Sequence, residues 1–172
     1  NEQLSFIEKE RGRHVLMTDV ASTEVVVKWV NKLQVLAEEM PWGIPINISS
    51  DPRHSVKSGF ESEYIKKKEN SQWPEYIGLA ATFSAKVVKN FAEITKLEYR
   101  ALGITTSLSP QIDLSTEPRW SRFKDGFGES TKLSVELTRA FCDGIQTTLN
   151  STSGWGSESV NAMVKHWPGG GA

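Results

Sequence analysis

Charged and polar side chains follow three short apolar segments of this 172-residue chain. They are Asp51 after residues 44–48, then Gln111, Asp113, Glu117, Arg119, Arg122 and Asp125 after residues 104–108, and Lys165 and His166 after residues 160–164. Carboxylates accept hydrogen bonds, whereas Lys, Arg and His donate them, and Trp rings pack against flat apolar faces. This combination suits a ligand that is dense in hydroxyl groups.

Two other chemistries use part of the same set. Lys165, at the end of a buried strand, could form a Schiff base with a carbonyl substrate, as in an aldolase. Lys165 and the glycines Gly169–Gly171 could instead cradle a phosphate. Neither chemistry requires Asp51, Arg122 and His166 together, so the hydroxyl-rich ligand is the favoured interpretation.

Each of these side chains also has an ordinary structural explanation. Lys165 can reach solvent, and His166 can be a buried histidine with satisfied partners. Arg119 and Arg122 can form surface ion pairs with nearby carboxylates. These explanations weaken when taken together, because three separate strands deliver charge to the same end.

The chain alternates between strand and helix patterns. Short apolar runs predict strands at His14–Met17, Ile44–Ile48, Ile104–Leu108 and Val160–Val164. Apolar residues at helical spacing predict helices over Glu24–Glu39, from the N-cap Ser84 to Ala101, and over Thr131–Gln146. Gly103 stands where a left-handed residue is expected to end the second of these helices. The polar, Lys-rich residues 51–75 predict a loop.

This alternation predicts an α/β fold with a parallel sheet. Either a doubly wound sheet or a (β/α) barrel satisfies it, but no GxGxxG motif follows the first strand, which disfavours a nucleotide-binding sheet. A complete barrel of the TIM type needs about 250 residues, so four strands correspond to about the first half of one. We therefore expect residues 1–172 to form a single, incomplete barrel domain that is truncated at its C-terminal end. In a barrel the charged residues share the active-site face.

The composition excludes several kinds of partner. Lys and Arg number 20 against 21 Asp and Glu, for a net charge of −1, which gives no reason to expect nucleic acid or an anionic membrane surface. No apolar run approaches the roughly 20 residues that span a bilayer. Cys142 is the single cysteine, which rules out an internal disulfide and a cysteine metal cluster. We expect no metal and no cofactor. No signal peptide is present at the start of this sequence, and this says nothing about the cellular compartment of the protein.

Two motifs are specific in combination: Pro118-Arg119-Trp120-Ser121-Arg122, and Lys165-His166-Trp167-Pro168-Gly169 after a strand. With them occur, in order along the chain, the segments GIPINISSDPRHS, GLAATFSAKVVKNFAEITKLEYRALGI, LSPQIDLSTEPRWSR, FGES, FCDGIQ and VNAMVKHWPGGG. Over nearly the whole chain, this series resembles the N-terminal barrel domain of family-three glycoside hydrolases.

The resemblance implies a glycosidase that retains anomeric configuration through a glycosyl-enzyme intermediate, of the β-glucosidase, β-xylosidase or exo-glucanase type. It implies that Asp51, Arg122, Lys165 and His166 bind the hydroxyls of the sugar at the cleavage site. Asp51 also begins an Asp-x-x-His sequence, as is usual in the family. Asp113, Arg119 and Asp125 are expected to support these side chains, although Asp125 stands where many members have Glu.

The resemblance also implies that the catalytic groups lie outside this chain. The family nucleophile is an Asp after a later strand, the acid/base of the glucosidase branch lies further on, and neither motif occurs here. The glucosaminidase branch uses a His after its Lys-His-Phe-Pro-Gly motif, whereas Gly169-Gly170-Gly171-Ala172 occupies that stretch here. This favours the glucosidase or xylosidase branch. An N-acetyl-β-glucosaminidase and a non-catalytic half-barrel that binds sugars remain the alternatives.

Partners and compartment follow from the same resemblance. The expected partner is a carbohydrate, such as a β-linked glucoside, xyloside or oligosaccharide. The family suggests a periplasmic or secreted protein. Half a barrel leaves its outer strands with one neighbour each, so we also expect self-association through that open edge.

Overall fold

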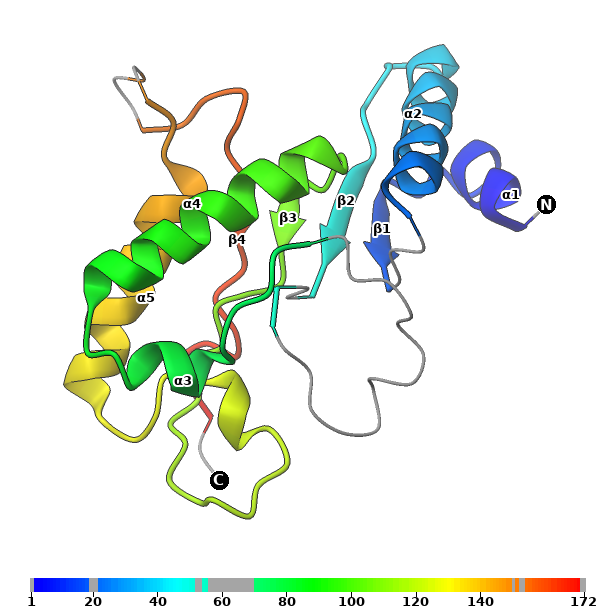
Figure 1. Ribbon diagram of the computed structural model, residues 1–172. Coiled ribbons are helices and arrows are strands. Elements are labelled where there is room, and N and C mark those ends of the chain that lie inside the picture. The colour runs from blue at the N-terminus through cyan, green and yellow to red at the C-terminus, as the bar shows by residue number, and fades with distance from the viewer. Residues whose placement is uncertain are drawn as a thin grey trace.

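The computed structural model describes residues 2–18, 22–51, 54–55, 70–149, 151 and 154–170. Four strands form one sheet in the order β1 (His14–Met17), β2 (Asn47–Ser50), β3 (Thr106–Ser107) and β4 (Asn161–Ala162) (Figure 1). The helices are α1 (Glu2–Glu8), α2 (Thr23–Glu39), α3 (Tyr76–Ala80), α4 (Ala85–Ala101) and α5 (Thr131–Gln146), with a 3-10 turn η2 at Phe123–Asp125.

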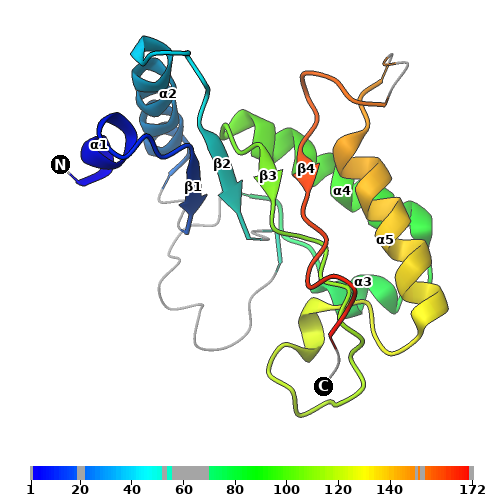
Figure 2. The same cartoon turned by 180° about the vertical axis from the view of Figure 1, so that it is seen from behind.

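All three strand pairs are parallel, as the sequence predicts. Helices α2, α4 and α5 lie on one face of the sheet, and the other face is seen without a helix in front of it when the molecule is turned round (Figure 2). A doubly wound sheet would have helices on both faces. The described part of the chain therefore has the one-sided arrangement of a (β/α) barrel, in which helices form the outer layer.

Local signals in the sequence start and end the long helices. Ser22, Ser84 and Ser130 each accept a hydrogen bond from a main-chain N–H of the first turn, which satisfies a donor that the helix itself leaves free. Gly103 adopts a φ of +78°, so the chain leaves α4 through the predicted left-handed glycine. The predicted bounds of α5 are confirmed, and those of α2 are confirmed to within one residue.

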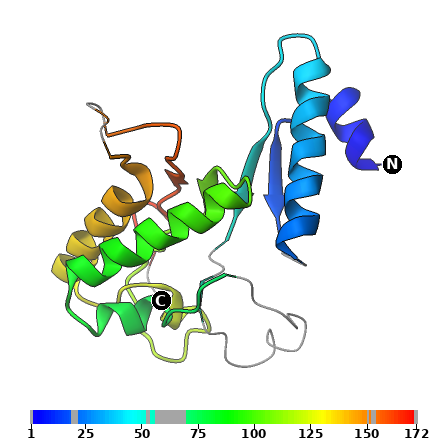
Figure 3. The same ribbon diagram turned by 45° about the horizontal axis from the view of Figure 1, so that its top comes forward.

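Helices α4 and α5 lie side by side and pack closely (Figure 3). Aromatic side chains pack beside them. The rings of Tyr76, Phe91 and Phe141 lie 5.9 to 6.1 Å apart, in tilted or edge-to-face orientations that aromatic quadrupoles favour. Burial raises the pKa of the Tyr76 hydroxyl far above its ordinary value, so this phenol is neutral. The core therefore ties α3, α4 and α5 into one unit.

The second strand lies further along the chain than the apolar pattern predicts. Pro45 has no N–H to donate, and the side chain of Gln34 binds both the N–H and the carbonyl of Ile46, at 2.9 and 2.8 Å. The ladder to β1 therefore begins at Asn47 and ends at Ser50. This shift places Asp51 directly after the strand.

Three short elements have no counterpart among the predicted ones: α1, α3 and η2. Each is seven residues or shorter, too brief to show a clear helical period. Most of the predicted loop 51–75 lies outside the described residues. Among the described helices, none has the length and apolar character needed to cross a membrane.

Candidate functional site

The residues that follow β2, β3 and β4 meet at the C-terminal ends of these strands. Beyond β4, the chain continues beside the segment that follows β3: the N–H of Lys165 donates to the carbonyl of Pro110 at 2.9 Å, and the N–H of Ile112 donates to the carbonyl of Lys165 at 2.6 Å. These bonds place Gln111 opposite Lys165. The sheet thus delivers side chains from distant parts of the sequence to one place.

Lys165 and Asp51 form the central contact of this site. The Nζ of Lys165 donates to Oδ1 of Asp51 at 2.7 Å, and the lysine side chain is only 15% exposed. The main-chain carbonyl of Asp51 also accepts a hydrogen bond of 2.6 Å from the buried hydroxyl of Tyr99 on α4. Asp51 is therefore held on both sides, while about half of its side chain remains open to solvent.

Arg122 reaches the same place from the turn that precedes η2. Its Nη2 donates to Oε1 of Gln111, and its Nε lies 3.3 Å from Oδ2 of Asp125. The guanidinium is partly exposed, so it keeps donors that can serve a ligand. The expected pairing of Arg122 with Asp125 is present in the structure.

His166 is oriented by the buried Asp113. The Nδ1 of His166 lies 2.7 Å from Oδ2 of Asp113, and the N–H of Gly170 donates to Oδ1 of the same carboxylate at 2.7 Å. A carboxylate only accepts, so Nδ1 carries the proton in this contact. The Asp113 side chain is 4% exposed, whereas about half of the His166 side chain faces solvent. Asp113 thus fixes both the ring and the glycine loop behind it.

Arg119 lies apart from these residues. Its guanidinium makes two hydrogen bonds to Glu117, of 2.9 and 2.7 Å, and its side chain is 88% exposed. The hydrogen bonds from Arg119 lower the pKa of the Glu117 carboxyl, which keeps that group ionised. The structure pairs Lys165 with Asp51, Arg122 with Asp125 and His166 with Asp113, and leaves Arg119 at the surface with Glu117.

Sequence reasoning missed a second group of residues that supports Asp51. His54 is buried, and its Nε2 lies 2.8 Å from Oε2 of Glu98, one position before Tyr99 on α4. The Glu98 carboxylate also accepts from the N–H of Ser71 at 2.9 Å. Burial lowers the pKa of His54, and the charge of Glu98 offsets part of this effect. The Asp-x-x-His spacing was the available signal, since it places a histidine three residues after Asp51.

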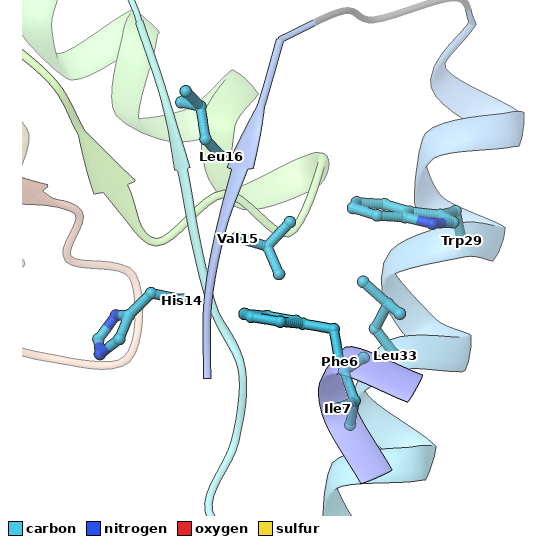
Figure 4. A pocket seen from close by; sticks show the side chains of 7 residues that line it. All are labelled: Phe6, Ile7, His14, Val15, Leu16, Trp29 and Leu33. Atoms are coloured by element: carbon cyan, nitrogen blue, oxygen red, sulfur yellow. The ribbon is translucent and has the colours of Figure 1, made fainter. Parts of the chain in front are cut away.

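Two cavities among the described residues lie outside this polar cluster. One, of about 340 Å³, is apolar, and Figure 4 shows Phe6, Val15, Trp29 and Leu33 converging between β1 and the helices α1 and α2. Another, of about 440 Å³, lies beside the site, between α5 and the segment Trp167–Gly169. In the described part of the chain, no three His, Cys, Asp or Glu residues group so as to hold a metal ion.

Comparison with known proteins assigns the family. The glycosyl hydrolase family 3 N-terminal domain matches residues 6–172. The chain is 46% identical over 142 residues to a periplasmic beta-glucosidase/beta-xylosidase of Dickeya chrysanthemi, covering 83% of this chain and 21% of that protein. It is 41% identical over 168 residues to a probable beta-glucosidase C of Aspergillus flavus, covering 95% and 25%. The chain therefore belongs to glycosyl hydrolase family 3, through its N-terminal domain.

Solved structures share the fold. A family 3 beta-N-acetylglucosaminidase from Paenibacillus superposes with a TM-score of 0.73 at 22% identity, over 98% of this chain and 30% of that one. A beta-glucosidase from Listeria innocua, in complex with glucose, superposes with a TM-score of 0.64 at 27% identity, over 88% and 19%. The chain spans about a quarter of the length of the curated relatives named above.

Proposed function

We propose that this chain supplies the sugar-binding part of the active site of a retaining β-glycosidase, acting at the non-reducing end of β-glucosides or related β-glycosides. The contact between Lys165 Nζ and Asp51 Oδ1 is the observation that supports this proposal most directly. It sets a cationic donor beside an anionic acceptor at the ends of two strands. Such a pair can bind adjacent hydroxyls of one sugar ring, because each hydroxyl both donates and accepts.

The neighbouring groups fit the same task. Arg122 and His166 add further donors, and each is oriented by its own partner, Asp125 for the arginine and Asp113 for the histidine. Oriented donors and acceptors lose less conformational freedom when a ligand binds. In this proposal Asp51, Arg122, Lys165 and His166 bind the sugar, while Asp113 and Asp125 hold two of them in place.

The glucosidase or xylosidase branch is the one we propose, with the catalytic nucleophile and acid/base outside this chain. The identity of 46% and 41% to proteins named beta-glucosidases supports this choice. The N-acetyl-β-glucosaminidase branch is the second candidate, and the Paenibacillus fold likeness is compatible with either. A half-barrel that binds sugars without cleaving them is the third.

The test is an assay of the longest protein that contains this chain, with aryl β-glucoside, β-xyloside and N-acetyl-β-glucosaminide. The anomer first released is followed by NMR. Hydrolysis of the glucoside or xyloside with retention supports the proposal. Turnover restricted to the glucosaminide supports the second candidate, and binding without turnover supports the third. Absence of both binding and turnover overturns the proposed function.

Two further properties are part of the proposal. We propose that residues 1–172 form part of one barrel domain, whose outer strands β1 and β4 can pair with a second copy. We also propose a periplasmic or secreted location, supported by a relative that is named periplasmic. Fractionation of the source cells tests the location.

A further inference from the structure

Gln111 contacts two of the residues that we propose to bind the sugar, Lys165 through the main chain and Arg122 through its side chain. It lies opposite Lys165 across an isolated parallel bridge, and the main-chain bonds that flank it, Lys165 N–H to Pro110 and Ile112 N–H to Lys165, fix the position of the lysine. Gln111 itself is 2% exposed. A buried polar side chain at the end of a strand needs partners, because an unpaired one is costly.

Only the oxygen of the Gln111 side-chain amide has a hydrogen-bond partner. Its Oε1 accepts from Nη2 of Arg122, whereas its Nε2 is buried without a hydrogen-bond partner. This contact fixes the amide orientation, since a guanidinium is donor-only and cannot accept from Nε2. Gln111 therefore gives its oxygen to Arg122 while its amide nitrogen is buried without a partner, which is unfavourable for the fold.

We propose that Gln111 is a positioning residue, which holds the guanidinium of Arg122 in the orientation that binds the sugar. This inference rests on the proposed function. Two hydrogen bonds are described for the Arg122 guanidinium. If the contact to Gln111 is lost, the bond of 3.3 Å from Nε to Asp125 remains. Because that carboxylate contacts Nε, it leaves the Nη groups free to rotate with the side chain. The contact to Gln111 fixes Nη2, at the end of the guanidinium away from Nε.

A double-mutant cycle tests this inference in the longest protein that contains the chain. The variants are Gln111→Met, Arg122→Met and the double variant, with kcat, KM and the melting temperature measured for each on the best aryl glycoside. Gln111→Met should raise KM about tenfold, as expected when one charge-assisted contact is lost. In the Arg122→Met background, the same change should have little further effect on KM, because the side chain that Gln111 positions is already gone.

Gln34→Met is the matched control. Gln34 also makes side-chain hydrogen bonds to a strand, but to Ile46 at the beginning of β2, the end opposite the site. The control should leave KM unchanged. Gln111→Asn, whose amide is one methylene too short to reach Arg122 in the same way, provides a second variant and should also raise KM.

Three outcomes decide the matter. An active wild type whose KM is unchanged by Gln111→Met and Gln111→Asn overturns the inference alone. Equal KM effects of Gln111→Met with and without Arg122 also overturn it, because Gln111 would then act independently of the arginine. A wild type that neither binds nor hydrolyses any of the glycosides removes the proposed function, and this inference with it.

Discussion

The ion pair between Lys165 and Asp51 joins two residues that are 114 positions apart in the sequence. Each group satisfies the charge of the other, and neither is fully withdrawn from solvent. Under the proposed function, a sugar hydroxyl can insert between such partners at modest cost, because it replaces one hydrogen bond with two. The proposal thus gives the pair a binding role in addition to its structural contact between strand ends.

Removing the lysine should weaken catalysis more than folding. We expect Lys165→Ala to lower kcat/KM by about 2–4 kcal/mol in the longest protein that contains the chain, because a partly buried charged donor to the sugar is lost. Steady-state kinetics with aryl β-glucoside or β-xyloside measures the change. Lys28→Ala is the control, since Lys28 pairs with Glu24 on the exposed face of α2. A loss below threefold for Lys165→Ala would make Lys165 an ordinary structural lysine.

His54 predicts a dependence of stability on pH. Burial lowers the pKa of the native imidazole, while the unfolded chain takes up its proton near the ordinary value of 6.5. The unfolded state therefore binds more protons as the pH falls below about 6.5, and the contribution of His54 to stability, present above that pH, is lost. Denaturant unfolding at pH 7.5 and pH 5 measures the difference. It should be smaller in His54→Gln, and an identical pH dependence in both proteins would exclude His54 as the cause.

At the scale of elements, the contact between α4 and α5 depends on a glycine. A Cβ added to Gly144 would lie 2.6 Å from the carbonyl oxygen of Lys89 and 2.8 Å from the Cβ of Ala92, both on α4. Atoms of a helix backbone cannot move aside singly, so a larger residue must push the two helices apart.

Gly144→Ala should destabilise the protein even though alanine is the better helix former. Helix propensity alone would favour the substitution by about 1 kcal/mol, whereas overpacking of a tight contact costs about 1–3 kcal/mol. We expect a net loss of stability, measured as a lower midpoint of thermal unfolding. Asp143→Ala, at the adjacent exposed position, is the control and should not show this loss. A stabilised Gly144→Ala would show that the helices can separate freely.

At the scale of the whole molecule, the sheet has two free edges among the described residues. Strands β1 and β4 stand at the ends of the order β1-β2-β3-β4. Leu16 and Met163, beside these edges, are about half-exposed, although Val160 is fully buried beneath α5. An edge strand next to apolar side chains can pair with another strand. At the β4 edge, however, the N–H of Ala162 already donates to Oε1 of Gln146 at 3.0 Å.

We therefore expect the isolated 172-residue chain to self-associate. Light scattering over a range of concentrations measures this, and a change of Leu16 to Lys should reduce it, because a charge at the edge opposes pairing. Leu97→Lys is a matched control, since Leu97 is similarly exposed but lies on α4. A monomer at high concentration would contradict the prediction.

The isolated chain should also hydrolyse no glycoside. Retaining cleavage needs a nucleophile and an acid/base, with carboxyl groups about 5–5.5 Å apart. The carboxylates at the site already have partners: Asp51 binds Lys165, Asp125 binds Arg122, and Asp113 accepts from His166 and Gly170. An ionised, paired carboxylate is a poor general acid. Turnover of aryl β-glucoside or β-xyloside above a boiled control, abolished by Asp113→Asn, would show that Asp113 is the nucleophile.

Local signals in the sequence were enough to predict the long helices. Serine caps, apolar residues at helical spacing and Gly103 specify α2, α4 and α5, because these signals act within a few residues of one another. The alternation of strands and helices likewise was enough to predict an α/β fold with a parallel sheet. The motifs around Arg122 and Lys165 were enough to predict the family, because they are specific in combination.

Which side chains contact one another depends on how distant segments pack. The beginning of β2 depends on Gln34, which binds Ile46 from the neighbouring helix, and the roles of Gln111, Tyr99 and His54 depend on the register of strands and helices. Arg119 lies only three residues before Arg122, yet it faces solvent, paired with Glu117. Contacts between distant segments follow from packing and register, which no local pattern encodes, and so the sequence did not predict that Gln111 binds Arg122 or that Tyr99 binds Asp51.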